Sequence, residues 1–201
     1  MKNLHDASIQ EHIRQKAGWD TSHFNKIHWD AHERASHTLP RFTRYNTAKL
    51  IHGLINTNKQ NNLYYGTSLL CPICKQEIET KEHVFKCSNP SAAPNRHEHL
   101  TALLKTLKQV NLDQNIVKTI NYGFTAWSKD QQEPVRPPTA GSLRGPDAVL
   151  MTAFHKQYRI LGWYHMCMGR ISKKWSAAAM QYTKESDIEH DEYWASIIIR
   201  A

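Results

Sequence analysis

The chain has 201 residues, enough for one domain of ordinary size or two small ones. Its 26 Lys and Arg residues outnumber its 18 Asp and Glu residues, so the net charge is +8, and 13 histidines add positive charge as the pH falls through about 6.5. No apolar run approaches the roughly 18 residues of a membrane span, and four cysteines are too few for a disulfide scaffold in a chain of this length.

Helical patterning dominates the first part of the chain. Residues 6–16 are polar and are followed by a glycine, which favours a helix that stops there. The aromatic and aliphatic residues of 19–29 come next, and we expect them to dock this segment onto a core. Pro40 is placed to open a second helix, and the Asn-rich stretch 56–62 predicts a break in helical structure.

The segment CPICKQEIETKEHVFKC, which begins at Cys71, is the most informative part of the sequence. Cys71 and Cys74 form a C-x2-C turn that directs two thiolates towards one point. Thr80 is a suitable N-cap for a short helix that carries His83 and Cys87 four residues apart on one face. Three sulfurs and one nitrogen suit the closed, tetrahedral sites that zinc favours in structural roles. We therefore predict one structural Zn²⁺ bound by Cys71, Cys74, His83 and Cys87, with no position left for a catalytic water.

Other interpretations of these residues exist. The cysteines can form a buried pair with His83 as a surface side chain. A redox role for the C-x2-C pair is a second option, but such a pair usually opens a helix after a strand, and it leaves His83 and Cys87 without a role. His97 and His99 are either substitute ligands or solvated helix residues.

Residues 71–87 resemble the zinc-binding region found downstream of the polymerase in reverse transcriptases of non-LTR-type retroelements. Weaker similarity extends to Trp19 and Ile27-His28-Trp29 upstream, to Arg96 and the leucine-rich stretch downstream, and to 157–175, which resembles the tail of retroelement-derived open reading frames. The resemblance implies a zinc-stabilised appendage that associates with nucleic acid and with a separate reverse transcriptase polypeptide. The chain departs from that family because it contains no polymerase palm and no Tyr-x-Asp-Asp motif.

The middle of the chain predicts two further helices and a linker. Leucines recur at helical spacing in 96–110, and another helix is expected over 113–127. Residues 128–146 contain four prolines and two glycines and form the best linker candidate. The predicted organisation is a helical domain over 1–127 that contains the zinc knuckle at 64–90, the linker over 128–146, and a C-terminal segment over 147–201.

The C-terminal segment predicts one long amphipathic helix over 147–184 with an acidic end over 185–201. On an ideal helix about half the circumference is apolar, and basic side chains gather on an arc of roughly 100° that includes Trp163. An aromatic ring within a basic stripe suits a surface that follows phosphates and stacks bases. The predicted nucleic-acid-binding residues are Lys156, Arg159, Trp163, Arg170, Lys173 and Lys174. The alternative is a solvated charged face with Trp163 packed on a neighbouring element.

The sequence does not favour an enzyme. The tetrapeptide Arg-Gly-Pro-Asp, which ends at Asp147, weakly resembles the signature of a restriction-like nuclease found in some retroelements. Two-metal cleavage needs further carboxylates near that aspartate, however, and the next acidic residue in the sequence is Glu185. His28 and His32 have the spacing of a metal pair but lack the H-E-x-x-H pattern of metalloproteases, so a structural or surface role is favoured.

These features predict a mainly α fold with one small CCHC zinc knuckle, a short β-ribbon as an option beside it, and a long C-terminal amphipathic helix. The leading function is a noncatalytic zinc-binding module, similar to the tail of a retroelement reverse transcriptase, that contacts RNA or DNA through basic surfaces. The alternative is a helical protein–protein interaction module in which zinc is purely structural. Because the N-terminal residues lack the apolar stretch of a secretory signal, we expect an intracellular protein, nuclear or cytoplasmic, with no membrane partner.

Overall fold

The computed structural model describes residues 2–52, 54–109, 112–130 and 145–183. Over these ranges the chain forms eleven α-helices, and β-structure is limited to two isolated bridges, Ile27 with Ser172 and Leu70 with Ile78. The predicted mainly α fold is confirmed, and a cluster of three cysteines and one histidine accompanies it. None of the helices in the described part of the chain is long and apolar enough to pass through a membrane.

Five helices form the N-terminal part, and polar side chains mark where several of them begin. Asp20 and Thr57 cap two of them by accepting hydrogen bonds from backbone N–H groups of the first turn. Helical structure is interrupted between Ile51 and Asn58, but a new helix begins at Asn58, within the stretch 56–62, so the expected break does not extend to the end of that stretch. The five helices are α1 (Lys2–Ala17), α2 (Thr21–Asn25), α3 (Trp29–Thr38), α4 (Arg41–Ile51) and α5 (Asn58–Tyr65).

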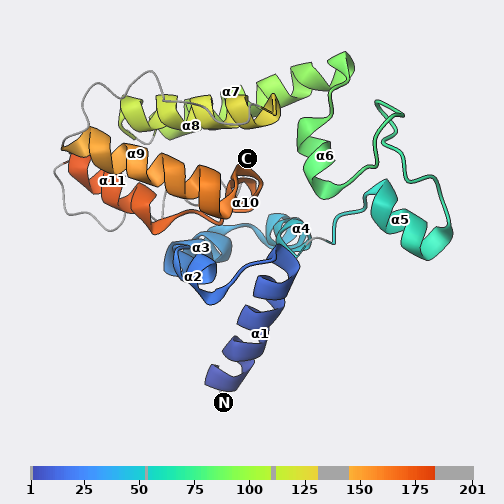
Figure 1. The fold of residues 1–201 in the computed structure, drawn as a ribbon, viewed down its shortest axis with the longest axis horizontal. Helices are drawn as coiled ribbons and strands as arrows, with labels where there is room; N and C mark the ends of the chain where they lie inside the picture. Colours follow the sequence, from blue (N-terminus) through green and yellow to red (C-terminus); the bar gives the residue numbers. More distant parts are fainter. Residues whose placement is uncertain (1, 53, 110–111, 131–144, 184–201) are drawn as a thin grey trace.

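The remaining helices pack into layers (Figure 1). Helices α7 and α8 run side by side along one side of the α9–α11 pair, α2 and α3 lie on the other side, and α6 and α5 occupy the far end. The bounds are α6 (Lys81–Lys86), α7 (Ala93–Gln109), α8 (Gln114–Ser128), α9 (Pro146–Lys156), α10 (Trp163–Cys167) and α11 (Lys173–Thr183).

The predicted single helix over 147–184 is instead a helical hairpin, in which α9 and α11 pack against each other. A π-helical turn follows α9, and Gly162 and Gly169 adopt φ values of +88° and +70°, which favour glycine because it has no Cβ. Buried Gln157 fastens the turn: its amide donates to the Gly162 carbonyl at 3.0 Å, and its carbonyl accepts from Ser172 N at 3.1 Å. The acidic end over 185–201 lies outside the described residues.

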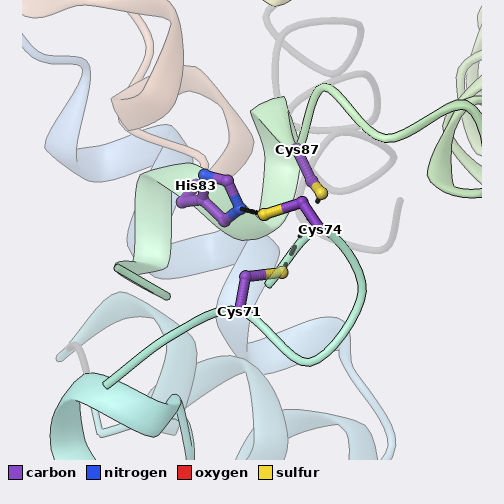
Figure 2. Close-up of side chains that lie close together, drawn as sticks. All are labelled: Cys71, Cys74, His83 and Cys87. Atoms are coloured by element: carbon purple, nitrogen blue, oxygen red, sulfur yellow. Dashed lines mark hydrogen bonds between the residues drawn. The ribbon is translucent and has the colours of Figure 1, made fainter. Parts of the chain in front are cut away.

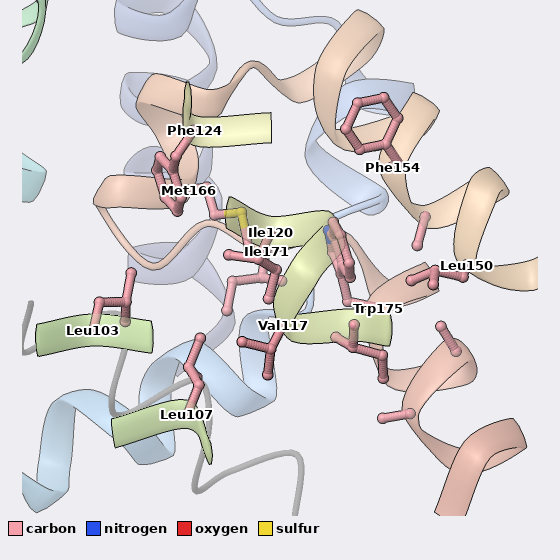
Figure 3. Packing of buried hydrophobic residues seen from close by; sticks show 14 of the residues in the cluster. Leu103, Leu107, Val117, Ile120, Phe124, Leu150, Phe154, Met166, Ile171 and Trp175 are labelled. Atoms are coloured by element: carbon pink, nitrogen blue, oxygen red, sulfur yellow. The ribbon is translucent and has the colours of Figure 1, made fainter. Parts of the chain in front are cut away.

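One large hydrophobic cluster forms the core (Figure 3). It combines buried side chains of α3, α7 and α8 with those of α9, α10 and α11. Described residues on both sides of the predicted linker therefore share one core. Most of the linker itself, 131–144, lies outside the described residues.

At the centre of this core, α8 approaches the Trp163 ring closely. A Cβ added to Gly123 would lie 1.9 Å from Cζ2 of Trp163, and the ring itself is only 1% exposed. Glycine at 123 is therefore required by packing, although it lies inside a helix, where alanine is normally preferred.

We expect Gly123→Ala to lower the free energy of unfolding by about 1–3 kcal/mol, because the buried indole must move to admit the methyl group. Chemical denaturation measures the change, and Asn121→Ala, at an exposed position of the same helix, is the matched control. Without the predicted clash, helix propensity alone would make Gly123→Ala more stable than the parent, and that sign would contradict the packing described here.

Candidate metal centre

A tight turn presents the first two cysteines. The backbone folds back on itself so that Leu70 pairs with Ile78, and Cys71 N donates to the Glu77 carbonyl at 2.8 Å. Lys75 closes the turn by donating its N–H to the Cys71 carbonyl at 2.8 Å, and it adopts the left-handed conformation with φ +57°. The optional β-ribbon is thus present as a single bridge, and the turn brings Cys71 and Cys74 to one side of the hairpin.

Helix α6 presents the other two donors. The predicted N-cap is confirmed, since the Thr80 hydroxyl accepts from His83 N at 3.0 Å. His83 lies within the helix with only 7% of its surface exposed, and Cys87 follows directly after the last helical residue with 1% exposed. We refer to residues 69–87, which comprise the hairpin and α6, as the knuckle.

The four donor atoms converge on one point (Figure 2). They all lie within 4.8 Å of one another, with Cys71 Sγ 3.9 Å from Cys87 Sγ and Cys74 Sγ 3.4 Å from His83 Nε2. Zinc bonds of about 2.3 Å to sulfur and about 2.0 Å to nitrogen separate tetrahedral ligands by roughly 3.5–3.8 Å. No disulfide joins these cysteines. The donor set and its spacing therefore fit one tetrahedral metal ion.

A second layer of contacts holds these donors in place. The Nδ1 atom of His83 lies 3.3 Å from a Glu77 carboxylate oxygen, so the imidazole directs Nε2 towards the sulfurs. A carboxylate behind a ligating histidine is a common support for metal sites, because it fixes the tautomer and the ring orientation. The Arg96 guanidinium donates to the Cys87 carbonyl, and the Asn89 amide donates to the Ile73 carbonyl at 3.2 Å.

The thiols differ in how readily they lose a proton. Backbone N–H groups of Gln76 and Glu77 donate to Cys74 and lower the pKa of its thiol to about 6. Burial raises the pKa of the Cys87 thiol. Near neutral pH, Cys74 is therefore ready to ligate as a thiolate, whereas a metal ion must displace the proton of Cys87.

The knuckle is joined to the helical body through α6. The Phe85 ring lies between Trp127 of α8 and Tyr164 of α10, with centroid separations of 6.3 and 6.1 Å. Lys86 forms an ion pair with Asp130 at 2.7 Å and lies over the Trp127 ring. The helix that carries His83 and leads directly into Cys87 therefore also carries the side chains that pack on the body.

The knuckle also supports α5. The Glu79 carboxylate accepts from the Asn58 backbone N–H at the start of α5, and the Asn58 side-chain amide donates to the Leu70 carbonyl at 2.7 Å. These contacts explain why a helix begins within an Asn-rich stretch: its first N–H groups are satisfied by the hairpin about twenty residues later.

The predicted basic stripe is not formed, because two of its six residues are buried. Trp163 belongs to the core, with ring contacts to Phe124, Phe154 and Trp175. Arg170 is 6% exposed and donates from Nη2 to the Ile51 carbonyl at 2.9 Å. The stripe was predicted on one continuous helix, but the turn between α9 and α11 places its residues on separate elements. Of the other predicted residues, Lys156 is half-buried, and Arg159, Lys173 and Lys174 are exposed.

The weaker candidate sites have structural contacts. His28 Nδ1 accepts from Ala31 N and caps α3, and the ring of His32 lies 3.1 Å from the Gly169 carbonyl. Asp147 accepts from the Tyr182 hydroxyl. Among the described residues, the cysteine–histidine cluster is the one group of three or more potential ligands that meets at a point. His97 and His99 are exposed on α7 and do not join it.

Comparisons with protein-family models, with curated proteins and with solved structures find no match to this chain. The relationship to retroelement reverse transcriptases thus stays a prediction from the motif. The metal centre is supported by its own geometry, including Glu77, a supporting residue that motif spacing alone did not identify.

We expect the purified protein to contain one zinc ion per chain, and Cys71→Ser or Cys87→Ser to lose most of it, because each substitution removes one of four ligands. Elemental analysis of protein purified without added metal measures the content. Cys167→Ser is the matched control, since this half-buried cysteine lies outside the cluster. Absence of stoichiometric zinc in the parent, or equal zinc in the cluster variants and the control, would contradict the assignment.

Proposed function

We propose that this chain is a noncatalytic nucleic-acid-binding module in which a structural zinc ion cross-links the two parts of the knuckle, the hairpin and α6. The observation that carries the proposal is the concentration of positive charge beside the knuckle. Lys16 of α1, Lys59 of α5 and Lys81 of α6 come from three separate elements and line one cavity. Burial, together with the neighbouring charges of Lys16 and Lys59, lowers the pKa of Lys81.

A structural role for the metal is supported by the complete donor set. Four protein ligands fill a tetrahedral zinc ion and leave no position for a water or a substrate. The knuckle also contributes little apolar burial of its own: among the described residues, the buried cluster at this place contains Cys71 and Cys87 of the knuckle and Ala92 just beyond it, with Cys74 packed against them. Zinc binding is therefore expected to supply much of the free energy that holds these residues together.

Nucleic acid is the partner that best matches the charge. The net charge is +8, and no acidic residue occurs between Arg34 and Lys75. Clustered cations bind polyanions by releasing condensed counterions, which requires no particular base sequence. Exposed Lys173 and Lys174 add positive charge at the start of α11. The resemblance of the cysteine–histidine motif to the zinc region of retroelement reverse transcriptases favours the same class of partner, and we propose that the chain derives from such an element.

We expect binding to oligonucleotides to be strongly salt-dependent and to weaken in the double variant Lys16→Gln/Lys59→Gln. Each lost phosphate contact on a single strand should reduce the slope of log K against log salt by about 0.7. Fluorescence anisotropy over a salt series measures both quantities, and because phosphate contacts carry no sequence information, different sequences should be affected alike.

Lys105→Gln/Lys108→Gln is the matched control, because both lysines are exposed on α7 and neither lines the cavity. If the two double variants lose affinity equally, the effect is one of net charge alone and the cluster beside the knuckle is not the interface. If the parent binds no oligonucleotide at low salt, the proposed function is wrong.

A protein–protein interaction module is the second candidate, and a specific observation favours it. Large apolar side chains on α5 and the knuckle are unusually exposed, and the six most exposed range from 46% for Val84 to 76% for Tyr65. Exposed apolar surface of this kind is typical of contact sites for other proteins. The set comprises Leu63, Tyr64, Tyr65, Ile73, Ile78 and Val84. Failure of nucleic-acid binding in the experiment above would make this the leading function.

A further inference from the structure

A cavity of about 400 Å³ lies where α1, α5, α6 and α10 meet, and the metal centre does not use it. Its lining is strongly basic. Lys16, Lys59, Lys81 and Arg170 contribute four cationic side chains, and Glu82 contributes a carboxylate that already pairs with Lys86 at 3.1 Å. Three histidines, His12, His52 and His165, also line it. The balance of charge inside the cavity is therefore clearly positive.

Arg170 is the most informative of these residues. It is 6% exposed, and within the described residues no carboxylate pairs with it. Its Nη2 donates to the Ile51 carbonyl, its Nη1 lies 3.0 Å from Nδ1 of His165, and its Nε has no hydrogen-bond partner in the described part of the chain. A guanidinium removed from water without an anion is unfavourable, so this position favours a negatively charged ligand.

Burial lowers the pKa of Arg170 to about 10, so its guanidinium is still charged near neutral pH, and neutral groups surround it. His165 accepts its hydrogen bond as a neutral imidazole, because burial and the positive charge of Arg170 lower the pKa of His165 to about 3. The Trp19 ring lies 5.6 Å from the guanidinium carbon, and a cation over an aromatic face is a favourable contact. The guanidinium is thus oriented by neutral groups, and among the described residues no anion neutralises its charge, which can therefore interact with an anionic ligand.

We propose that this cavity binds the terminal phosphate of a nucleic-acid strand, an inference that rests on the proposed function and names the group recognised. A phosphomonoester carries a charge of about −1.5 to −2 near neutral pH, against −1 for an internal phosphodiester, and so matches a site with several cations. Planar guanidinium groups pair well with phosphate oxygens.

The size and remaining lining of the cavity agree with one terminal nucleotide. A volume of about 400 Å³ is within the range of small-molecule sites, and an internal phosphate flanked by two sugars is less suited to such a recess. Ile13, Leu63 and Met168 supply apolar surface beside the cations for the attached sugar or base.

The test compares oligonucleotides of one sequence that carry a 5′-phosphate, a 3′-phosphate or hydroxyl ends only, by fluorescence anisotropy at fixed salt. We expect a phosphorylated end to bind about tenfold more tightly than the hydroxyl-ended strand, a difference typical of charge-assisted hydrogen bonds to a buried cation. In Arg170→Gln the ratio of the two affinities should fall to near one. Inorganic phosphate should compete with the phosphorylated strand more effectively than with the hydroxyl-ended strand.

Circular dichroism and zinc content establish whether Arg170→Gln is folded. If it is not, Lys81→Gln replaces it as the test of the affinity ratio, with Lys105→Gln on α7 as the control that keeps the ratio of the parent. Equal affinities for the phosphorylated and hydroxyl-ended strands in the parent, with salt-dependent binding retained, would overturn this inference and leave the proposed function intact. No binding to any strand would overturn the proposed function itself.

Discussion

The convergence of three thiols and one imidazole on a single point is the interaction on which the knuckle and, through it, α5 depend (Figure 1). Apolar burial alone does not hold the knuckle together, since Ile73, Ile78 and Val84 are all exposed to about half of their surface. A metal ion bound by these four donors would replace the missing core by cross-linking the hairpin to α6. This small unit then provides the carboxylate of Glu79 on which α5 begins.

The six-residue helix α6 carries residues of the candidate metal site, of the contact with the helical body and of the basic cavity. His83 faces the metal cluster, Phe85 packs between Trp127 and Tyr164, and Lys81 lines the basic cavity. Movement of α6 would therefore disturb the ligand set, the contact with the body and the charge of the cavity together. The Trp163 core is separate, because its buried residues come from α3 and from the helices α7 to α11 and include none of the knuckle.

Sequence reasoning succeeded where the determining contacts are local. The C-x2-C turn, the Thr80 cap and the spacing of His83 and Cys87 act over a few residues, and the structure confirms that they assemble one cluster. The helices expected over 96–110 and 113–127 correspond to α7 and α8, because leucine spacing and the Asp113 cap are also local signals.

Sequence reasoning failed where contacts between distant parts of the chain determine the structure. Gly162 and Gly169 permit the turn between α9 and α11, but the bridge of Ser172 to Ile27 and the bonds of Gln157 stabilise it, and neither is visible in helical periodicity. The burial of Trp163 and Arg170 follows from that turn. The basic cavity could not be predicted either, since its cations come from three helices and the segment that connects α10 to α11, spread over more than 150 residues.

The central claim is that a metal ion holds the hairpin and α6 of the knuckle together, and with them α5, beside a core whose buried residues include none of the knuckle. Hydrogen–deuterium exchange of the zinc-loaded protein, before and after chelation, measures this directly. The account predicts that chelation removes protection from the amides of 69–87 and α5, while α8, α9 and α11 stay protected. Unchanged exchange in the knuckle after complete removal of the metal would contradict the claim.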